Sequence, residues 1–338
     1  MSGRLDFGII LGDAPTAVDA RTHLDGILRQ VDAAERAGFT HVTIGQHLLY
    51  PGYRWLQPIP LLARLAATTG PQLRLVTSVV IAPLYHPALL AEELATLDVV
   101  SDGRLTVGIG AGYRPEELAH VGVPHGERFA RLEEALELID LVWAGEPFDF
   151  DGRFWRLEGA TPHVVPLQRP RPPLWLGALR PAGIRRAARL GDAWMVTPEL
   201  PWDEVERGRA VFAAERDAHG LAPARLPLRR EIVLGDSLDG ALAAYEARTA
   251  GRYAAYAERG LAGADHRAGF RDWALDRAVL GTPEECVARL AAIDADAFGP
   301  VVVRPSWPGM ETADVVAAIE ALGRDVIAPL HESREALR

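Results

Sequence analysis

The feature that most constrains the fold is a regular alternation of short apolar runs with longer segments of helical periodicity along the 338-residue chain. Parallel strands need a crossover between them, so this alternation predicts an α/β fold with a parallel sheet. Eight such runs favour a TIM-type (β/α)₈ barrel over the competing open, doubly wound sheet. The runs span Leu5–Leu11, His41–Gly45, Leu73–Val79, Leu105–Ile109, Leu174–Gly177, Ala193–Val196, Leu228–Leu234 and Val301–Arg304.

Helices are expected between these runs, and several carry terminal signals. Gly38 suits the position after a helix C-terminus, and Thr282-Pro283-Glu284-Glu285 predicts a capping box that starts a helix toward Ile293. The other predicted helices span Leu24–Ala37, Pro58–Thr69, Pro87–Val100, Arg128–Trp143 and Ala313–Leu322.

Two stretches exceed a minimal barrel, and we expect both on its rim within one domain of residues 1–338. The first insertion lies around 144–173, where Phe148–Leu157 alternates about Asp151-Gly152 like a hairpin and Pro162–Pro173 is irregular. The second lies around 241–279 and has a helical pattern.

Composition excludes several classes of function. The formal net charge is −10, which does not suit binding to nucleic acid or an anionic membrane, and no apolar run approaches the ~18 residues of a membrane helix. Lysine is absent, which removes Schiff-base chemistry. Cys286 is the only cysteine, and no metal-binding histidine motif occurs. These features predict a cytoplasmic protein without a metal site.

Functional side chains are expected where the strands end, because barrel active sites lie at the carboxyl ends of the strands. His47 follows the second run, and histidine is a residue type suited to proton transfer. Gly177 and Ala178 precede a helix that begins near Pro181, and a helix N-terminus binds phosphate well; Arg180 could add charge.

At these positions the chain resembles the luciferase-like monooxygenase family. The resemblance is clearest in Tyr85-His86-Pro87, in Ala91 to Asp98, in Ser101-Asp102-Gly103-Arg104-Leu105 and in Gly108 to Tyr113. A second stretch runs from Pro173 to Ala178 and from Arg186 to Trp194. The resemblance reaches about Pro198 and returns at Gly281-Thr282-Pro283.

The resemblance implies a (β/α)₈ barrel that binds reduced FMN or, in one large branch, the deazaflavin coenzyme F-420. It places His47 near the flavin ring as the catalytic residue and often puts a non-proline cis peptide at the position of Ser78-Val79. Gly110, Gly112 and Tyr113 would border the cofactor, and Gly177, Ala178, Arg180 and Pro181 would hold its phosphate. Residues that could line the substrate pocket are Glu116, Thr197, Arg304 and Trp307.

The resulting hypothesis is a flavin-dependent oxidoreductase, specifically a two-component monooxygenase that takes reduced FMN from a separate reductase and acts on a small organic substrate with oxygen. A homodimer is common in such families. Two alternatives stay open: a deazaflavin-dependent hydride-transfer enzyme, and a flavin-binding protein without turnover. Tyr113 stands where the sugar-phosphate-oxidising deazaflavin branch usually has glutamate, which counts against that activity.

Overall fold

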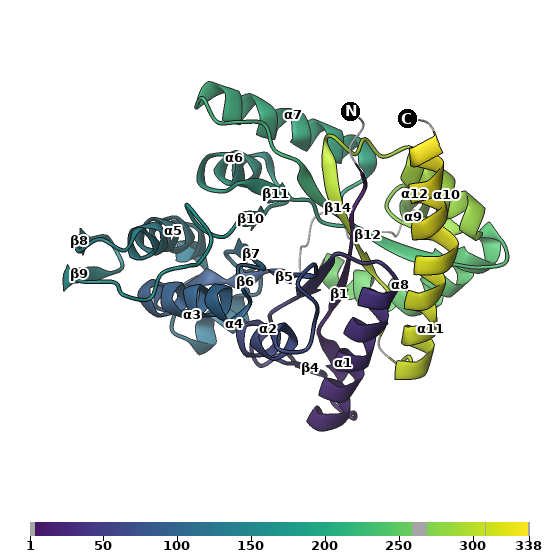
Figure 1. The fold of residues 1–338 in the computed structure, drawn as a ribbon, viewed down its shortest axis with the longest axis horizontal. Coiled ribbons are helices and arrows are strands. Elements are labelled where there is room, and N and C mark those ends of the chain that lie inside the picture. Colours follow the sequence, from purple (N-terminus) through teal and green to yellow (C-terminus); the bar gives the residue numbers. More distant parts are fainter. Residues whose placement is uncertain (1–3, 259–268, 308, 337–338) are drawn as a thin grey trace.

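All eight predicted strands are present in one parallel sheet. The computed structural model describes residues 4–258, 269–307 and 309–336. Its strands follow the order β11-β10-β7-β5-β3-β1-β14-β12-β13, and β6 also pairs with β7 (Figure 1). Their bounds are β1 (Phe7–Leu11), β3 (His41–Ile44), β5 (Arg74–Thr77), β6 (Val80–Ile81), β7 (Leu105–Gly110), β10 (Leu174–Gly177), β11 (Ala193–Met195), β12 (Leu226–Leu234), β13 (Val279–Gly281) and β14 (Phe298–Arg304).

The sheet closes on itself where the end of β11 meets β12. Val196 forms a parallel bridge with Leu228. The Val196 N–H donates to the Pro227 carbonyl at 2.9 Å, and the Val196 carbonyl accepts from the Arg229 N–H at 2.9 Å. The eight-stranded (β/α)₈ barrel predicted from the sequence is therefore confirmed.

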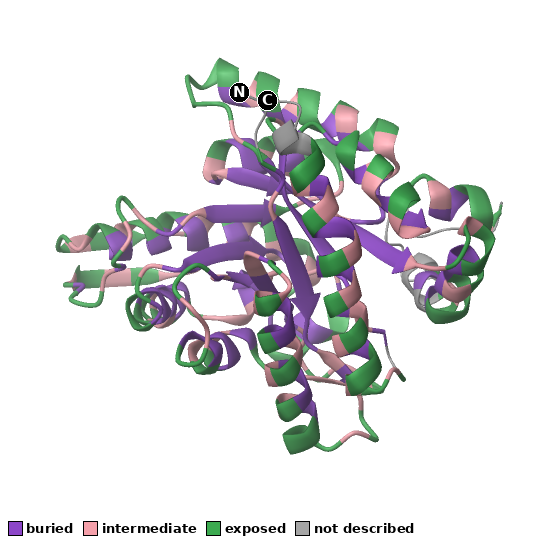
Figure 2. Cartoon of the chain, turned by 45° about the vertical axis from the view of Figure 1, so that its right-hand side comes forward, coloured by how far each residue is buried: buried purple, intermediate pink, exposed green. Residues whose placement is uncertain are grey.

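Helices pack around this barrel with their outer faces exposed, while the strands are buried (Figure 2). The expected terminal signals are present: Gly38 has φ +85° after the first helix, and Thr282 and Glu285 form the capping box. The surrounding helices are α1 (Ala20–Arg36), α2 (Pro58–Ala66), α3 (Pro87–Val100), α5 (Arg128–Ala144), α6 (Pro181–Leu190), α7 (Trp202–Ala218), α10 (Pro283–Ala291), α11 (Thr312–Leu322) and α12 (Ala328–Ala336).

Short elements that were not expected from the sequence include β6 and β13, whose bounds are given above, and three others. β2 (Asp13–Pro15) follows β1, β4 (Tyr53–Trp55) follows β3, and the two form an antiparallel pair. α4 (Pro115–His120) follows β7. Elements of two to six residues are too short to show a clear period of their own. The third strand also ends earlier than predicted, at Thr77 rather than Val79.

The hairpin predicted in the first insertion is confirmed as β8 (Phe148–Asp151) and β9 (Arg156–Ala160). The Glu134 carboxylate of α5 fastens its tip, because it accepts three backbone N–H bonds at 2.8–3.0 Å from Arg153, Phe154 and Trp155. A single side chain of the barrel layer thereby fixes where the hairpin sits.

The second insertion contains α8 (Leu238–Glu258) and α9 (Phe270–Leu275), and residues 259–268 within it lie outside the described part of the chain. It has a small apolar core of its own, in which Tyr245, Tyr253 and Trp273 pack with Trp307 from the segment after β14. We call these two helices with this core the α8–α9 lobe.

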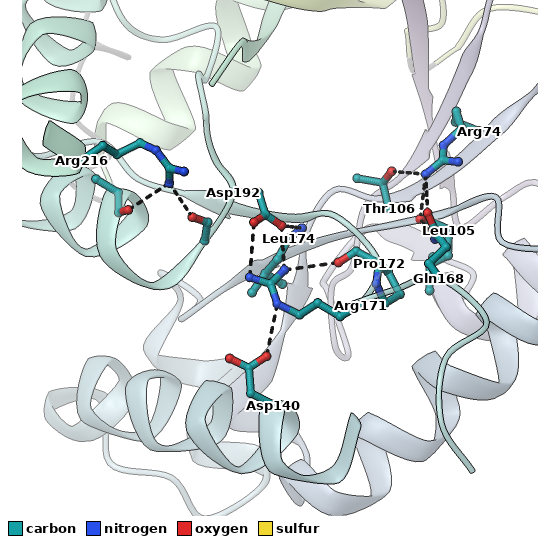
Figure 3. A network of polar contacts seen from close by, with 12 residues as sticks. Arg74, Leu105, Thr106, Asp140, Gln168, Arg171, Pro172, Leu174, Asp192 and Arg216 are labelled. Atoms are coloured by element: carbon teal, nitrogen blue, oxygen red, sulfur yellow. Dashed lines mark hydrogen bonds and ion pairs between the residues drawn. The ribbon is translucent and has the colours of Figure 1, made fainter. Parts of the chain in front are cut away.

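Polar side chains hold the amino-terminal end of the barrel (Figure 3). Arg74, at the start of β5, donates to the carbonyl of Leu105 and to the amide oxygen of Gln168, both at 3.1 Å. Gln168 in turn donates to Asp98 at 2.7 Å. Nearby, Arg104 donates to four backbone carbonyls, those of Ala66, Gly70, Leu73 and Ser101. The stretch from Asp98 to Arg104 therefore serves the scaffold and lies at the end opposite to the active site.

A substitution inside the barrel should test how closely two strands approach. A Cβ added at Gly108 would lie 2.0 Å from the carbonyl oxygen of Thr77, so Gly108→Ala must displace backbone. We expect it to lower the free energy of unfolding by about 2 kcal/mol or more. Gly251 in α8 has open space around the same position. Gly251→Ala should instead stabilise by about 0.5–1 kcal/mol. Urea unfolding of both variants checks this, and equal effects would contradict it.

Candidate active site

His47, predicted as the catalytic residue, lies just after β3 and contacts a buried carboxylate. Its Nδ1 is 2.6 Å from Oε1 of Glu117, which α4 carries. The same oxygen accepts the Leu48 N–H at 3.3 Å. The Glu117 side chain is 2% exposed and that of His47 is 12% exposed. The carboxylate therefore fixes both the ring of His47 and the backbone that follows it.

This contact decides which nitrogen of His47 can exchange a proton with a bound molecule. A carboxylate only accepts hydrogen bonds, so the contact places a proton on Nδ1 of His47. In the neutral ring, Nε2 is then the acceptor. Histidine with an oriented Nε2 is the arrangement that general acid–base catalysis uses.

Arg114 balances the charge of the Glu117 carboxylate. Its Nη1 lies 3.4 Å from Oε1 of Glu117, and its side chain is buried. The guanidinium carbon also lies 4.2 Å from the centre of the Tyr50 ring. A buried carboxylate is tolerated when it is paired and hydrogen-bonded. Arg114 thus offsets part of the cost of burying the Glu117 carboxylate beside His47.

Aromatic rings surround the imidazole of His47. The ring centres of Tyr50 and Trp55 lie 4.7 Å and 4.6 Å from it, and that of Tyr113 lies 6.0 Å away. Gln57 donates to the carbonyl oxygen of His47 at 3.0 Å. These neighbours limit the rotation of the imidazole and keep much of it from water.

The strand ends beside His47 meet around Val79. The Ser78–Val79 peptide is cis, as the resemblance implies. A Cβ added at Gly110 would lie 3.0 Å from Val79, and one added at Gly177 would lie 3.6 Å from it. Ser78 Oγ lies 3.5 Å from the sulfur of Met195 on β11. The structure therefore brings together the predicted cofactor positions at the ends of β5, β7 and β10, and we call Ser78, Val79, Gly110 and Gly177 the shelf.

Next to the shelf, α6 begins without a side-chain cap. Arg180 is its N-cap residue and Pro181 its first residue, and no side chain accepts a hydrogen bond from the first turn. Gly177 and Arg180 are exposed, and Ala178 is half-buried. Uncapped N–H groups at a helix N-terminus suit a phosphate group. A flavin with its ring on the shelf and its phosphate at this turn fits the residues present.

The four residues predicted for the substrate pocket lie in different surroundings, and two of them are neighbours, since the Arg304 guanidinium lies 5.7 Å from the centre of the Trp307 ring. Glu116 is 62% exposed and lies 3.8 Å from Arg114, while its neighbour Glu117 points to His47. Arg304 is buried and pairs with Asp13 at 2.9 Å. Trp307 belongs to the core of the α8–α9 lobe. The remaining residue, Thr197, follows β11, and its buried Oγ1 has no hydrogen-bond partner among the described residues.

Sequence reasoning missed Glu117, Arg114 and Trp55 as neighbours of His47. Two adjacent glutamates, Glu116 and Glu117, follow a proline, and only the observed start of α4 at Pro115 decides which one faces inward. A helical face could have been assigned to Glu117 had α4 been recognised, since Glu117 and the buried Leu118 share the inner side.

Comparison with known proteins gives the family. The family model described as luciferase-like monooxygenase matches residues 5–298.

The chain belongs to the luciferase-like monooxygenase family.

Relatives within this family act with different cofactors. The chain is 32% identical over 227 residues to the oxygenase component of the flavin-dependent trigonelline monooxygenase of Acinetobacter baylyi, a match that covers 66% of this chain and 62% of the relative. It is 37% identical over 174 residues to an F420-dependent glucose-6-phosphate dehydrogenase of Beutenbergia cavernae, covering 48% and 50%. The matches thus span about half to three fifths of these luciferase-like relatives.

A solved structure extends the likeness over the whole fold. The monooxygenase RslO1 from Streptomyces bottropensis is 27% identical and superposes with a TM-score of 0.81, covering 96% of this chain and 99% of that one. Among the residues that the structure describes, no helix is long and apolar enough to cross a membrane. The same residues contain no group of three or more potential metal ligands.

The two adjacent glutamates of α4 offer a matched test of the site. Glu117→Gln removes the charge that Arg114 faces in a buried position, so it should lower the free energy of unfolding by about 3 kcal/mol. Glu116→Gln, on the exposed side, should change it by less than about 0.5 kcal/mol. Chemical denaturation of both variants is the measurement. A similar loss in the two would show that Glu117 does not balance Arg114.

Proposed function

We propose that the chain is the oxygenase component of a two-component flavin monooxygenase. In this proposal a separate reductase provides reduced FMN, and oxygen is used on a small organic substrate. The observation that carries the proposal is the His47–Glu117 contact at 2.6 Å, which orients an imidazole beside the shelf. The match to the oxygenase component of a flavin-dependent monooxygenase supports it.

The residues that would hold the cofactor lie at three strand ends. The start of α6, with Gly177, Ala178, Arg180 and Pro181, would bind the phosphate, and Ser78–Val79 would support the ring. Gly110 and Gly112 would border the ring; at Gly112 a Cβ would lie 2.9 Å from Ile81, so packing against Ile81 already requires glycine there. Reduced FMN, when bound, supplies the electrons that take one oxygen atom of O₂ to water.

The side chains of the protein handle protons and water. His47 would accept or donate a proton at Nε2 while Glu117 holds Nδ1. Tyr50, Trp55 and Tyr113 would exclude water from the reacting atoms, which strengthens the electrostatic interactions there. Glu116, Thr197, Arg304 and Trp307 stay proposals for the substrate side. A cytoplasmic homodimer is the proposed assembly.

A second candidate is deazaflavin-dependent hydride transfer on the same barrel. The 37% identity to an F420-dependent dehydrogenase favours it. Both cofactors are planar and anionic, so the shelf and the start of α6 would suit either one. Tyr113, at the place of a glutamate in one deazaflavin branch, is our reason for proposing FMN.

Anaerobic titration separates the two cofactors. Reduced FMN should bind with a micromolar or lower Kd, about −8 kcal/mol, and oxygen should then be consumed with oxygenation of a substrate. Fluorescence or absorbance titration with each cofactor measures this. Tighter binding of the deazaflavin, with turnover in strict anaerobiosis, would make the second candidate the function, and flavin binding without turnover would favour a binding protein.

Removal of His47 tests the proton-transfer role. His47→Ala should lower turnover by ~10²–10⁴-fold while the affinity for the cofactor stays the same. His219, on the outer surface of α7, offers a control because its side chain is 46% exposed. His219→Ala should leave turnover unchanged. Normal turnover by the His47 variant would remove this residue from the mechanism.

A further inference from the structure

An arginine that no predicted role covers points into the barrel from β12. The two neighbours of Arg229 on this strand face outward: Leu228 lies in the core that packs against the helices, and the guanidinium of Arg230 lies 5.2 Å from the ring of Trp202 on α7. Successive side chains of a strand point to opposite faces. Arg229 therefore faces the barrel interior, beside Val302 of β14.

Arg229 differs from Arg304 on the neighbouring strand β14, which has an acidic partner. The Nε of Arg229 is buried and lacks a hydrogen-bond partner, and no acidic group of the described residues lies within ion-pair distance of its guanidinium. By contrast, Arg304 pairs with Asp13 at 2.9 Å. Keeping an unpaired guanidinium partly away from water is unfavourable. Such a group is stabilised when an anion binds to it.

A second unpaired donor lies next to Arg229. The Arg229 N–H donates to the carbonyl of Val196 at 2.9 Å, so the residue after Val196, Thr197, lies at the level of Arg229 on the adjacent strand. Thr197 Oγ1 is buried without a hydrogen-bond partner in the described part of the chain. Met195, two residues earlier, lies on the same face and contacts Ser78 of the shelf at 3.5 Å.

We propose that Arg229 and Thr197 bind the carboxylate of a small organic substrate. This inference rests on the proposed function, since it names the substrate class for the same barrel mouth. A planar guanidinium matches a carboxylate in a two-point contact, and the threonine hydroxyl can donate a third hydrogen bond.

The charged side chains near Arg229 favour a ligand that carries a single negative charge. Glu231 occupies the next inward position on β12, where Tyr245 donates to it at 2.5 Å. Arg304 lies between two carboxylates, at 2.9 Å from Asp13 and 4.0 Å from Glu231, and so has no charge to spare for a ligand. One unpaired guanidinium balances a monoanion, whereas a phosphate dianion would also face the charge of Glu231. Like charges placed together are unfavourable.

The strand geometry also sets the size of the substrate. Thr197 lies two residues beyond Met195, the last residue of β11, which corresponds to ~7 Å along an extended chain. Because Met195 contacts Ser78 of the shelf, this short span suits a small acid, and benzoate is a probe of that size.

The test compares three probes of similar shape: benzoate, neutral benzamide and phenyl phosphate. Ligand-induced thermal shifts report affinity because a ligand that binds only the folded state stabilises it. Measured on the flavin-free protein and again with FMN, benzoate should bind at least about tenfold more tightly than either other probe. Arg229→Met should abolish this preference and leave benzamide unchanged. Arg207→Met, an exposed arginine of α7 (65% exposed), is the control and should keep it.

The melting temperature without ligand gives an independent readout. Loss of an unpaired guanidinium should leave the Tm of Arg229→Met unchanged or higher, whereas loss of a structural arginine would lower it. Thr197→Val is the second variant and should weaken benzoate several-fold with little effect on benzamide.

Several results would overturn the assignment. They are equal affinity for benzoate and benzamide, tighter binding of phenyl phosphate, no benzoate binding at millimolar concentration, or benzoate preference retained by Arg229→Met. Failure of FMN to bind, with the benzoate preference intact, would instead reject the proposed function and leave the carboxylate site standing.

Discussion

Closure of the barrel between Val196 and Leu228 is the contact on which the site depends. β10 and β11 are only four and three residues long, and this bridge joins them to the long strand β12. Side chains behind them strengthen the join: Arg216 donates to the carbonyls of Ala188 and Gly191, and Arg171 bonds to Asp192 at 2.6 Å (Figure 3). Without closure, the turn between β10 and α6 would have no fixed position relative to β12 and β14.

The parts of the structure that sequence predicts are those that local chemistry determines. The eight strands show their apolar runs, and the caps at Gly38 and Thr282 need only residues a few positions apart. The position of His47 follows from the rule that strand ends form the site. Its partner Glu117 is 70 residues away along the chain, so the contact depends on how α4 packs. Short strands such as β2 and β4 form by pairing with each other, and they meet because they follow the neighbouring strands β1 and β3.

The same distinction explains why Arg229 escaped notice. On sequence alone Arg229 and Arg230 are equivalent neighbours, and both could pair with acids in solvent. The outward stacking of Arg230 on Trp202 fixes the inward direction of Arg229. The absence of lysine makes arginine responsible for all basic contacts. Arg104 illustrates this, because its several donors bond to four separate backbone carbonyls, which a single ammonium group would do with less geometric control.

The attachment of the β8–β9 hairpin has a consequence for how such a barrel can diversify. The Glu134 carboxylate holds the hairpin tip through backbone N–H groups, and any residue except proline supplies an N–H. The anchor therefore restricts the tip only at Gly152, where a Cβ would lie 2.1 Å from the Glu134 carboxylate, and leaves the other side chains of the tip unspecified. Mutations there can accumulate without loss of the attachment, so the rim of this barrel is open to rapid evolutionary change while the register of its strands stays constant.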